Sequence, residues 1–305
     1  MMALESHVPN WEWYYIAMYF FIGGVSAGAY FIGSLLELLG EEKNREISKI
    51  AYYIAFPTIL VTPVLLIADL GSPLRFWHLF FYTKEGIPYM NTTSPLSVGT
   101  WALLIYGGMS FVSFLNVLSA DGKLKSPAVT KLLNLVNRIP HKVYAVTGAF
   151  FGVFVAGYTG VLLNITARPL WAATDPLVGS LFIVSGASTG AAAIALAMAR
   201  QKIASGENFE RLESFDRIAM IAELALIVLM IVVAGRYAAP ILKGFYGIMF
   251  LGGTVVLGIL VPLWINWRGR ALVAAKTDPV MLSAALVLFG GALLRISLVQ
   301  AGQIQ

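Results

Sequence analysis

Long apolar runs alternate with short polar connections along the whole chain. Each run holds about 20 or more mainly apolar residues, the length that an α-helix needs to cross a bilayer. The eight runs cover approximately residues 14–39, 47–69, 97–118, 143–163, 177–198, 215–234, 245–266 and 281–299. An open chain in lipid must satisfy its own backbone hydrogen bonds, so we expect every run to be helical. The pattern predicts an all-α integral membrane protein with eight transmembrane helices, the first of them retained and not removed as a signal peptide.

Basic residues in the connections set the expected orientation. Fourteen Lys and Arg residues fall in or beside the connections after the first, third, fifth and seventh runs, against five on the opposite side. Cytoplasmic loops carry the excess of basic residues in membrane proteins. We therefore expect a multi-pass protein of the cell (inner) membrane with both termini on the outer (periplasmic) side. The formal net charge of +5 reflects this asymmetry and gives no reason to expect nucleic-acid binding.

Composition limits the chemistry that this chain can hold by itself. With 58% hydrophobic and 12% charged residues, the spans leave no room for a soluble catalytic domain. The absence of cysteine excludes thiolate zinc sites and cysteine-ligated iron–sulfur clusters. The three histidines offer no pair inside the bilayer, so we expect no haem with two histidine ligands and no other bound metal.

Two segments of the chain resemble each other. Phe21–Ala29 and Ile183–Ala191 share Gly, Ser, Gly and Ala at four matching positions, and each contains a Gly-x-x-x-Gly spacing that lets helices approach closely. We interpret the match as a duplication that gives two four-helix bundles, residues 1–170 and 171–305. Small-residue packing alone could also produce it.

Polar groups collect at the predicted outer end of the second run. Gly71 is expected to form a left-handed cap and Pro73 to prevent the helix from continuing, which leaves Asp69 in the last turn. Asp69 could pair with Arg75 and fix the loop, or it could exchange protons beside an apolar ligand, and the two interpretations are compatible. His78 follows among aromatic residues, as an interfacial side chain or a ligand.

Three tyrosines are candidates for binding a flat ligand. Tyr15 and Tyr19 are spaced by one helical turn, which predicts that their phenols share one inward face, beside an interfacial aromatic belt. Tyr158 lies between Gly157 and Gly160, where a narrow helix could let a flat group lie against its ring. The alternative is a tyrosine that fills a gap between helices.

Two charges fall inside predicted spans. Glu223 is in the middle of the sixth run, and Arg295 is one to two turns from the outer end of the eighth. Charges inside a membrane are rare and are usually paired or functional. A proton pathway and a buried structural ion pair both remain open.

Four sequence blocks resemble the membrane subunit of polysulfide reductase and its NrfD-like relatives. They are Trp13 to Gly28, Asp69 to His78 (D-L-G-S-P-L-R-F-W-H), Thr93 to Ser97, and Gly157 to Leu163 followed by Pro169-Leu-Trp171. The resemblance covers essentially the whole chain and implies an eight-helix quinone-reactive subunit. It implies menaquinone or ubiquinone as ligand, a docked ferredoxin-like four-cluster iron–sulfur subunit, and a molybdopterin catalytic subunit beyond it.

The resemblance also implies roles for particular residues. The quinone ring contacts fall on Leu70 and Gly71, a hydroxyl donor on Tyr158, and a proton-exchanging carboxylate on Asp69. Some family members bind the quinone through an Asn and a His on the first helix, at positions that fall near Tyr15 and Tyr19 here. Because Tyr19 replaces that His, Asp69 or His78 is expected to take over the second quinone oxygen.

The function that we expect is that of a quinone-binding subunit of a multisubunit oxidoreductase, which exchanges electrons between the quinone pool and the iron–sulfur subunit. A quinone site needs apolar walls, a hydrogen-bond donor and a group that trades protons, and these residues supply all three. A transporter or proton-translocating protein and a purely structural membrane anchor are the alternatives.

Overall fold

The computed structural model describes residues 11–40, 44–84, 87–166, 168–272 and 278–304. Within these ranges, eight helical segments are long and apolar enough to cross a membrane. They are Trp13–Leu39, Arg45–Asp69, Pro95–Ala120, His141–Asn164, Leu177–Arg200, Glu207–Leu242, Gly244–Arg268 and Pro279–Ala301. The predicted spans are therefore confirmed, and only the sixth is much longer at both ends than its apolar run.

Several spans are assembled from shorter elements, and short elements connect them. The elements are η1 (Trp13–Ala17), α1 (Met18–Leu39), α2 (Arg45–Asp69), η3 (Pro73–Leu79), β1 (Tyr82–Lys84), β2 (Ile87–Tyr89), α3 (Pro95–Ala120), α4 (Pro127–Val136), α5 (His141–Asn164), α6 (Pro169–Ala172), α7 (Leu177–Arg200), α8 (Glu207–Ala234), η4 (Gly235–Ala238), α9 (Ala239–Leu242), α10 (Gly244–Gly247), η5 (Ile248–Leu260), α11 (Val261–Leu272) and α12 (Asp278–Ala301).

The sixth span is longer than predicted because its first turns are amphipathic. Glu207 and Glu210 lie in the first turn of α8, where negative charge stabilises the helix dipole. Phe209 and Leu212 are buried on the other face. Hydropathy averaged over this segment is low, although one face of it packs like the rest of the span.

Helix α2 contains two prolines and still runs without a break. Proline has no N–H, so Pro63 leaves the carbonyl of Ile59 without its usual helical donor. The hydroxyl of Thr62 donates to that carbonyl at 2.8 Å. A neighbouring side chain thus restores the hydrogen bond that lipid could not supply.

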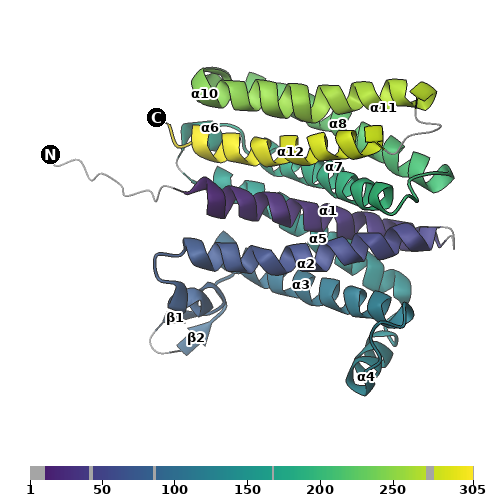
Figure 1. Cartoon of the computed structure of the whole chain (residues 1–305). Coiled ribbons are helices and arrows are strands. Elements are labelled where there is room, and N and C mark those ends of the chain that lie inside the picture. Colours follow the sequence, from purple (N-terminus) through teal and green to yellow (C-terminus); the bar gives the residue numbers. More distant parts are fainter. Residues whose placement is uncertain (1–10, 41–43, 85–86, 167, 273–277, 305) are drawn as a thin grey trace.

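A hairpin interrupts the helical pattern between the second and third spans. Strands β1 and β2 pair antiparallel, with Tyr82 opposite Tyr89. We expected helices alone, because a polar connection carries no hydropathy signal for two strands of three residues. The hairpin follows η3, and both lie at the same end of the helices as the chain termini, below them on the left of Figure 1.

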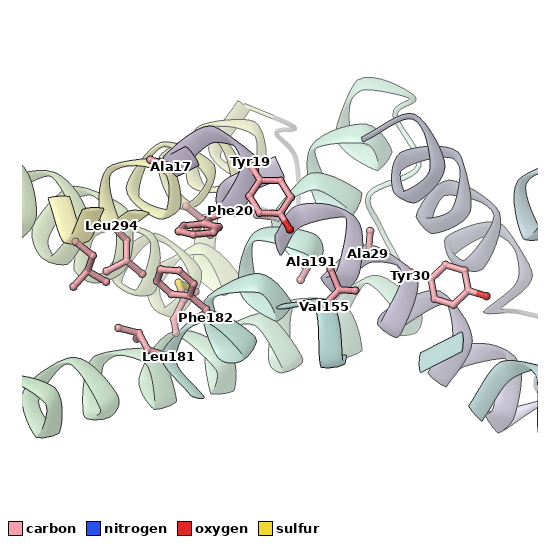
Figure 2. Packing of buried hydrophobic residues seen from close by; sticks show 14 of the residues in the cluster. Ala17, Tyr19, Phe20, Ala29, Tyr30, Val155, Leu181, Phe182, Ala191 and Leu294 are labelled. Carbon is pink, nitrogen blue, oxygen red and sulfur yellow. The ribbon is translucent and has the colours of Figure 1, made fainter. Parts of the chain in front are cut away.

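Helices α1 and α7 lie in the middle of the molecule and pack closely against each other. A Cβ atom built on Gly186 would come within 3.2 Å of the Gly24 carbonyl oxygen, and one on Gly190 would overlap the backbone of Gly28. The two similar segments therefore meet in matching register. Figure 2 shows the apolar side chains around this contact, where the rings of Phe20 and Phe182 lie 5.8 Å apart.

The remaining helices pack on either side of this central pair. Helix α1 contacts α2 and α5, and α3 packs between those two, whereas α7 contacts α8 and α12, and η5 packs against α12. The division into two four-helix bundles at residue 170 stays a prediction.

Trp11 and Gln303 meet through a 2.7 Å hydrogen bond, so both ends of the described chain lie at one end of the molecule (Figure 1). Which membrane side this end faces also stays a prediction.

Candidate functional site

The block that follows α2 lies at the end of the molecule that holds the chain termini. Helix α2 ends at Asp69, and Leu70 takes an extended conformation with φ −69° and ψ 126°. Gly71 is not left-handed, so the expected cap is wrong. The chain leaves the helix through the extended Leu70, and Pro73 then starts the short helix η3.

Asp69 is partly buried at the end of α2. Its carboxylate interacts electrostatically with Glu12 and with Tyr14, at the start of the first span. Within the described part of the chain it forms no ion pair with Arg75, which is exposed, so of the two interpretations that the sequence left open the pair is not formed. Asp69 is thus an acid without a counter-ion, close to the aromatic start of the first span.

His78 and Arg75 are exposed on η3. The Nδ1 atom of His78 is 3.2 Å from the Arg75 carbonyl oxygen, and its ring stacks on Trp77 with centroids 3.6 Å apart. These contacts agree with the interpretation of His78 as an interfacial side chain. Leu70 is partly buried and Gly71 is exposed.

Tyr15 and Tyr19 point to different neighbours. The ring of Tyr15 packs on Tyr14 at 4.6 Å, whereas the buried Tyr19 packs on Phe20 at 5.4 Å. The first turns of this span form the π-helix η1, which is wider than an α-helix and shifts the register between the two tyrosines. Tyr19 interacts electrostatically with Tyr158 of α5 and so belongs to the same region of the core.

Tyr158 is buried, and its ring lies directly over Gly99 of α3. A Cβ atom on Gly99 would overlap the ring, so only glycine leaves room for it. The ring is parallel to that of Phe154, with centroids 6.2 Å apart. Its hydroxyl donates a long hydrogen bond of 3.5 Å to the carbonyl oxygen of Leu96. A hydrogen bond of that length is weak, so a better acceptor could replace the Leu96 carbonyl.

Gly157 and Gly160 both pack closely against α7, and Gly157 also borders the cavity beside Tyr158. A Cβ atom on Gly157 would come within 2.8 Å of Ile183, and one on Gly160 within 2.6 Å of Gly179. Both glycines therefore serve the close packing of α5 against α7. The glycine that receives the Tyr158 ring is on another helix, α3.

A cavity of about 540 Å³ opens beside Tyr158. It lies between the start of α3, helix α5 and one side chain of α7, and it is mainly apolar. It is lined by Thr92, Thr93, Pro95, Val98, Phe150, Val153, Phe154, Gly157, Tyr158, Val161 and Ile183. The structure thus brings together the blocks around Thr93 and Tyr158. Asp69, Leu70 and Gly71 do not line this cavity.

A second polar cluster surrounds Arg295, which is fully buried in α12. Its Nη1 atom donates to the Ser185 hydroxyl at 2.5 Å and to the Gly291 carbonyl at 3.0 Å. Its guanidinium lies 5.0 Å from the centre of the Phe182 ring. Glu223 is also buried, and it interacts with both Ser185 and Arg295. The two predicted intramembrane charges therefore belong to one cluster, with Ser185 between them.

Asp216 extends this cluster, although it was not among the predicted site residues. It is buried near the start of the apolar part of α8, and the hydroxyl of Ser188 donates to its carboxylate at 2.7 Å. Asp216 and Glu223 are seven residues apart and so share one face of α8. The spacing is visible in the sequence, but the predicted span begins at residue 215 and leaves Asp216 at its edge.

The chain is similar in sequence to known proteins over nearly its whole length. A family model described as "Polysulphide reductase, NrfD" matches residues 4–305. The chain belongs to the NrfD family. A protein named NrfD homolog from Haemophilus influenzae is 28% identical, over 98% of this chain and 96% of its own. A polysulfide reductase component of Wolinella succinogenes is 28% identical, over 96% and 94% of the two sequences. A selenate reductase component of Mesobacillus selenatarsenatis is 24% identical, over 63% of this chain and 48% of its own.

This NrfD-family chain is a multi-pass membrane protein with two separate groups of chemically distinctive side chains. One group places a buried phenol beside an apolar cavity, and the other holds three buried charges. In the part of the chain that the structure describes, no three His, Asp or Glu side chains gather to hold a metal ion. The first group can offer a hydrogen bond to a flat apolar ligand, and the second can hold or pass a proton.

Proposed function

We propose that this chain is the quinone-binding membrane subunit of a multisubunit reductase. The observation that carries the proposal is the mainly apolar cavity of about 540 Å³ with the phenol of Tyr158 at its wall. A quinone head is flat and apolar and has two oxygens that accept hydrogen bonds. Two relatives are named as parts of a polysulfide and a selenate reductase, which supports membership of such a complex.

In this proposal Tyr158 turns its hydroxyl from the Leu96 carbonyl to a quinone oxygen. The exchange costs little, because the existing hydrogen bond is long. Phe154 and Val98 supply the apolar walls of the ring site. Tyr19 lies close to Tyr158 and supplies the second phenol of the site.

Asp69 exchanges the protons that accompany electron transfer, because reduction of a quinone consumes two electrons and two protons. Among the described residues it has no counter-ion, and it interacts with the start of the first span, where Tyr15 lies. Leu70 and Gly71 do not line the cavity, so we assign them, together with the exposed Arg75 and His78, to the proton-exchange region around Asp69 and not to the ring site. This arrangement puts proton exchange near the surface and the ring site deeper in the helices.

The electrons must enter or leave through a partner, because the chain has no cysteine. We propose a ferredoxin-like four-cluster iron–sulfur subunit docked at the end that holds η3 and the termini, with a molybdopterin catalytic subunit beyond it. The outer, periplasmic position of that end and the two four-helix bundles, residues 1–170 and 171–305, belong to the same proposal.

The test is quinone-linked turnover of the assembled complex. Tyr158→Phe removes the donor and keeps the ring, and we expect it to raise the quinone KM by roughly tenfold, the worth of one hydrogen bond of about 1.5 kcal/mol. Tyr246→Phe is the matched control, because that phenol makes no hydrogen bond in the described chain. Asp69→Asn should lower kcat, and Asp175→Asn, the same change at an exposed carboxylate just before α7, should not. If Tyr158→Phe and Asp69→Asn both turn over like the wild type in an intact complex, the proposed quinone site is wrong. The chain would then act as a structural membrane anchor.

A second function is favoured by the buried cluster of Glu223, Arg295 and Asp216. We propose that these residues carry protons along the contact of α7 with α8, with Ser185 and Ser188 between them. Glu223→Gln should abolish proton movement in proteoliposomes of the complex and leave quinone turnover measurable under uncoupled conditions. A variant that moves protons like the wild type would mean that the cluster is structural.

A further inference from the structure

Helix α4 (Pro127–Val136) lies beside the end of α3, at the end of the molecule opposite the termini (Figure 1). It connects α3, which ends at Ala120, to α5, which begins at His141. It therefore lies at the level where membrane spans end, which is the level of the lipid headgroups. Only one of its side chains, Leu133, is buried.

A groove of about 1150 Å³ runs along α4 and its flanking loops and reaches the end of α3 at Ser119. Three basic side chains line it together with leucines and small polar residues. The bases are Lys125, Lys131 and Arg138, and the leucines are Leu124, Leu132 and Leu135. Lys131, Leu135 and Arg138 are spaced by three and four residues, so bases and an exposed leucine alternate along one face of the segment.

Among the described residues, no acid neutralises the positive charge of the groove. No acidic residue lines the groove, and within the described chain the three bases form no ion pair. Two described acids at this end of the molecule are already engaged. Asp121 pairs with Lys49 and Lys123, and Glu37 pairs with His141 at 3.2 Å.

We propose that this groove is a binding site for an anionic phospholipid. Its anionic headgroup would lie along the row of Lys125, Lys131 and Arg138, with the phosphate at Lys131, and its acyl chains along Leu124, Leu132 and Leu135. Three unpaired bases beside an apolar surface, at the depth of the headgroups, match both halves of such a lipid. The site is independent of the proposed quinone site, which lies toward the other end of the molecule.

The test uses the purified full chain in a neutral detergent and counts bound lipid by native mass spectrometry during titration. We expect phosphatidylglycerol to bind more tightly than phosphatidylcholine. Each base near a membrane surface contributes roughly a fivefold change in binding. Lys131→Gln combined with Arg138→Gln should therefore weaken phosphatidylglycerol binding by roughly 25-fold.

The matched control is Arg200→Gln combined with Lys202→Gln, which removes two bases from the same end outside the groove. It should bind phosphatidylglycerol within twofold of the wild type. Thermal unfolding in neutral detergent checks that the groove variant is folded. Equal binding of the two lipids, an unaffected groove variant, or equally tight binding of inorganic phosphate would overturn the proposal. So would a dimer that forms through α4 and is lost in the groove variant.

Discussion

Replacing Arg295 with methionine removes a buried charge and keeps most of the side-chain volume. The substitution loses the hydrogen bonds of Nη1 to the Ser185 hydroxyl and the Gly291 carbonyl. It also leaves Glu223 buried without the positive charge with which it interacts. Removing one member of a buried charged pair costs about 3–5 kcal/mol, and we expect a loss of that size in the free energy of unfolding.

The assay is reversible unfolding in mixed detergent micelles, applied to a double-mutant cycle. Arg295→Met and Glu223→Gln are measured singly and together. If the two residues interact, the double variant should be more stable than the sum of the single losses predicts, by about 1–3 kcal/mol. Ser185→Ala, which removes the hydroxyl between them, should reduce that coupling energy.

Additive losses, with a coupling energy under about 0.5 kcal/mol, would refute this reasoning. They would mean that the two charges are stabilised separately, each by its own hydrogen bonds. The cluster would then be two polar sites on neighbouring helices. The proposed proton route would lose the interaction that joins Glu223 to Arg295.

Three further predictions follow from close contacts and from one surface ion pair. Gly99→Ala should displace the Tyr158 ring and cost about 1–3 kcal/mol of unfolding free energy. Gly108→Ala, on the same helix but with open space around it, should cost nothing. Equal losses in the two variants would contradict the contact between Gly99 and the Tyr158 ring. Gly190→Ala should separate α1 from α7 and cost at least as much, against a neutral Gly252→Ala, when both are compared by thermal unfolding. Hydrogen bonds from Lys49 and Tyr53 hold the pKa of Asp121 below its usual range, so the stability that it adds should be present at neutral pH and lost as the pH falls through that lowered pKa. Asp121→Asn should remove this part of the acid dependence, and an unchanged pH profile would show that the pair contributes nothing.

The spans could be predicted from the sequence because lipid leaves the backbone no alternative to a helix. Their ends were harder, as Glu207–Leu242 shows. The hydropathy averaged over an amphipathic first turn with acids at the helix start is as low as that of a loop, so the average does not indicate a helix there. The end of α2 was misjudged for a similar local reason, since Leu70 leaves the helix in an extended conformation and Gly71 is not needed as a cap.

Among the residues that line the cavity, the sequence singled out Tyr158 as a site residue but not the neighbours of its ring. A membrane helix is apolar on nearly all sides, so the sequence does not say which face meets which helix. The glycines beside Tyr158 in the sequence turned out to pack on α7, whereas Gly99 of α3 receives the ring. Asp69 and Arg75, six residues apart, remain unpaired because η3 carries Arg75 into the exposed loop.

The repeated segments suggest how one scaffold came to hold two kinds of chemistry. Their glycines meet at the contact between α1 and α7, so neither segment can change there without separating the helices. The matching serines point into different surroundings. Ser26 bonds to the Tyr106 hydroxyl and the Ala55 carbonyl, whereas Ser188 bonds to the carboxylate of Asp216. The α1 side is therefore built from neutral phenols and hydroxyls, which suits a quinone, and the α7 side holds the buried charges, which suit a proton.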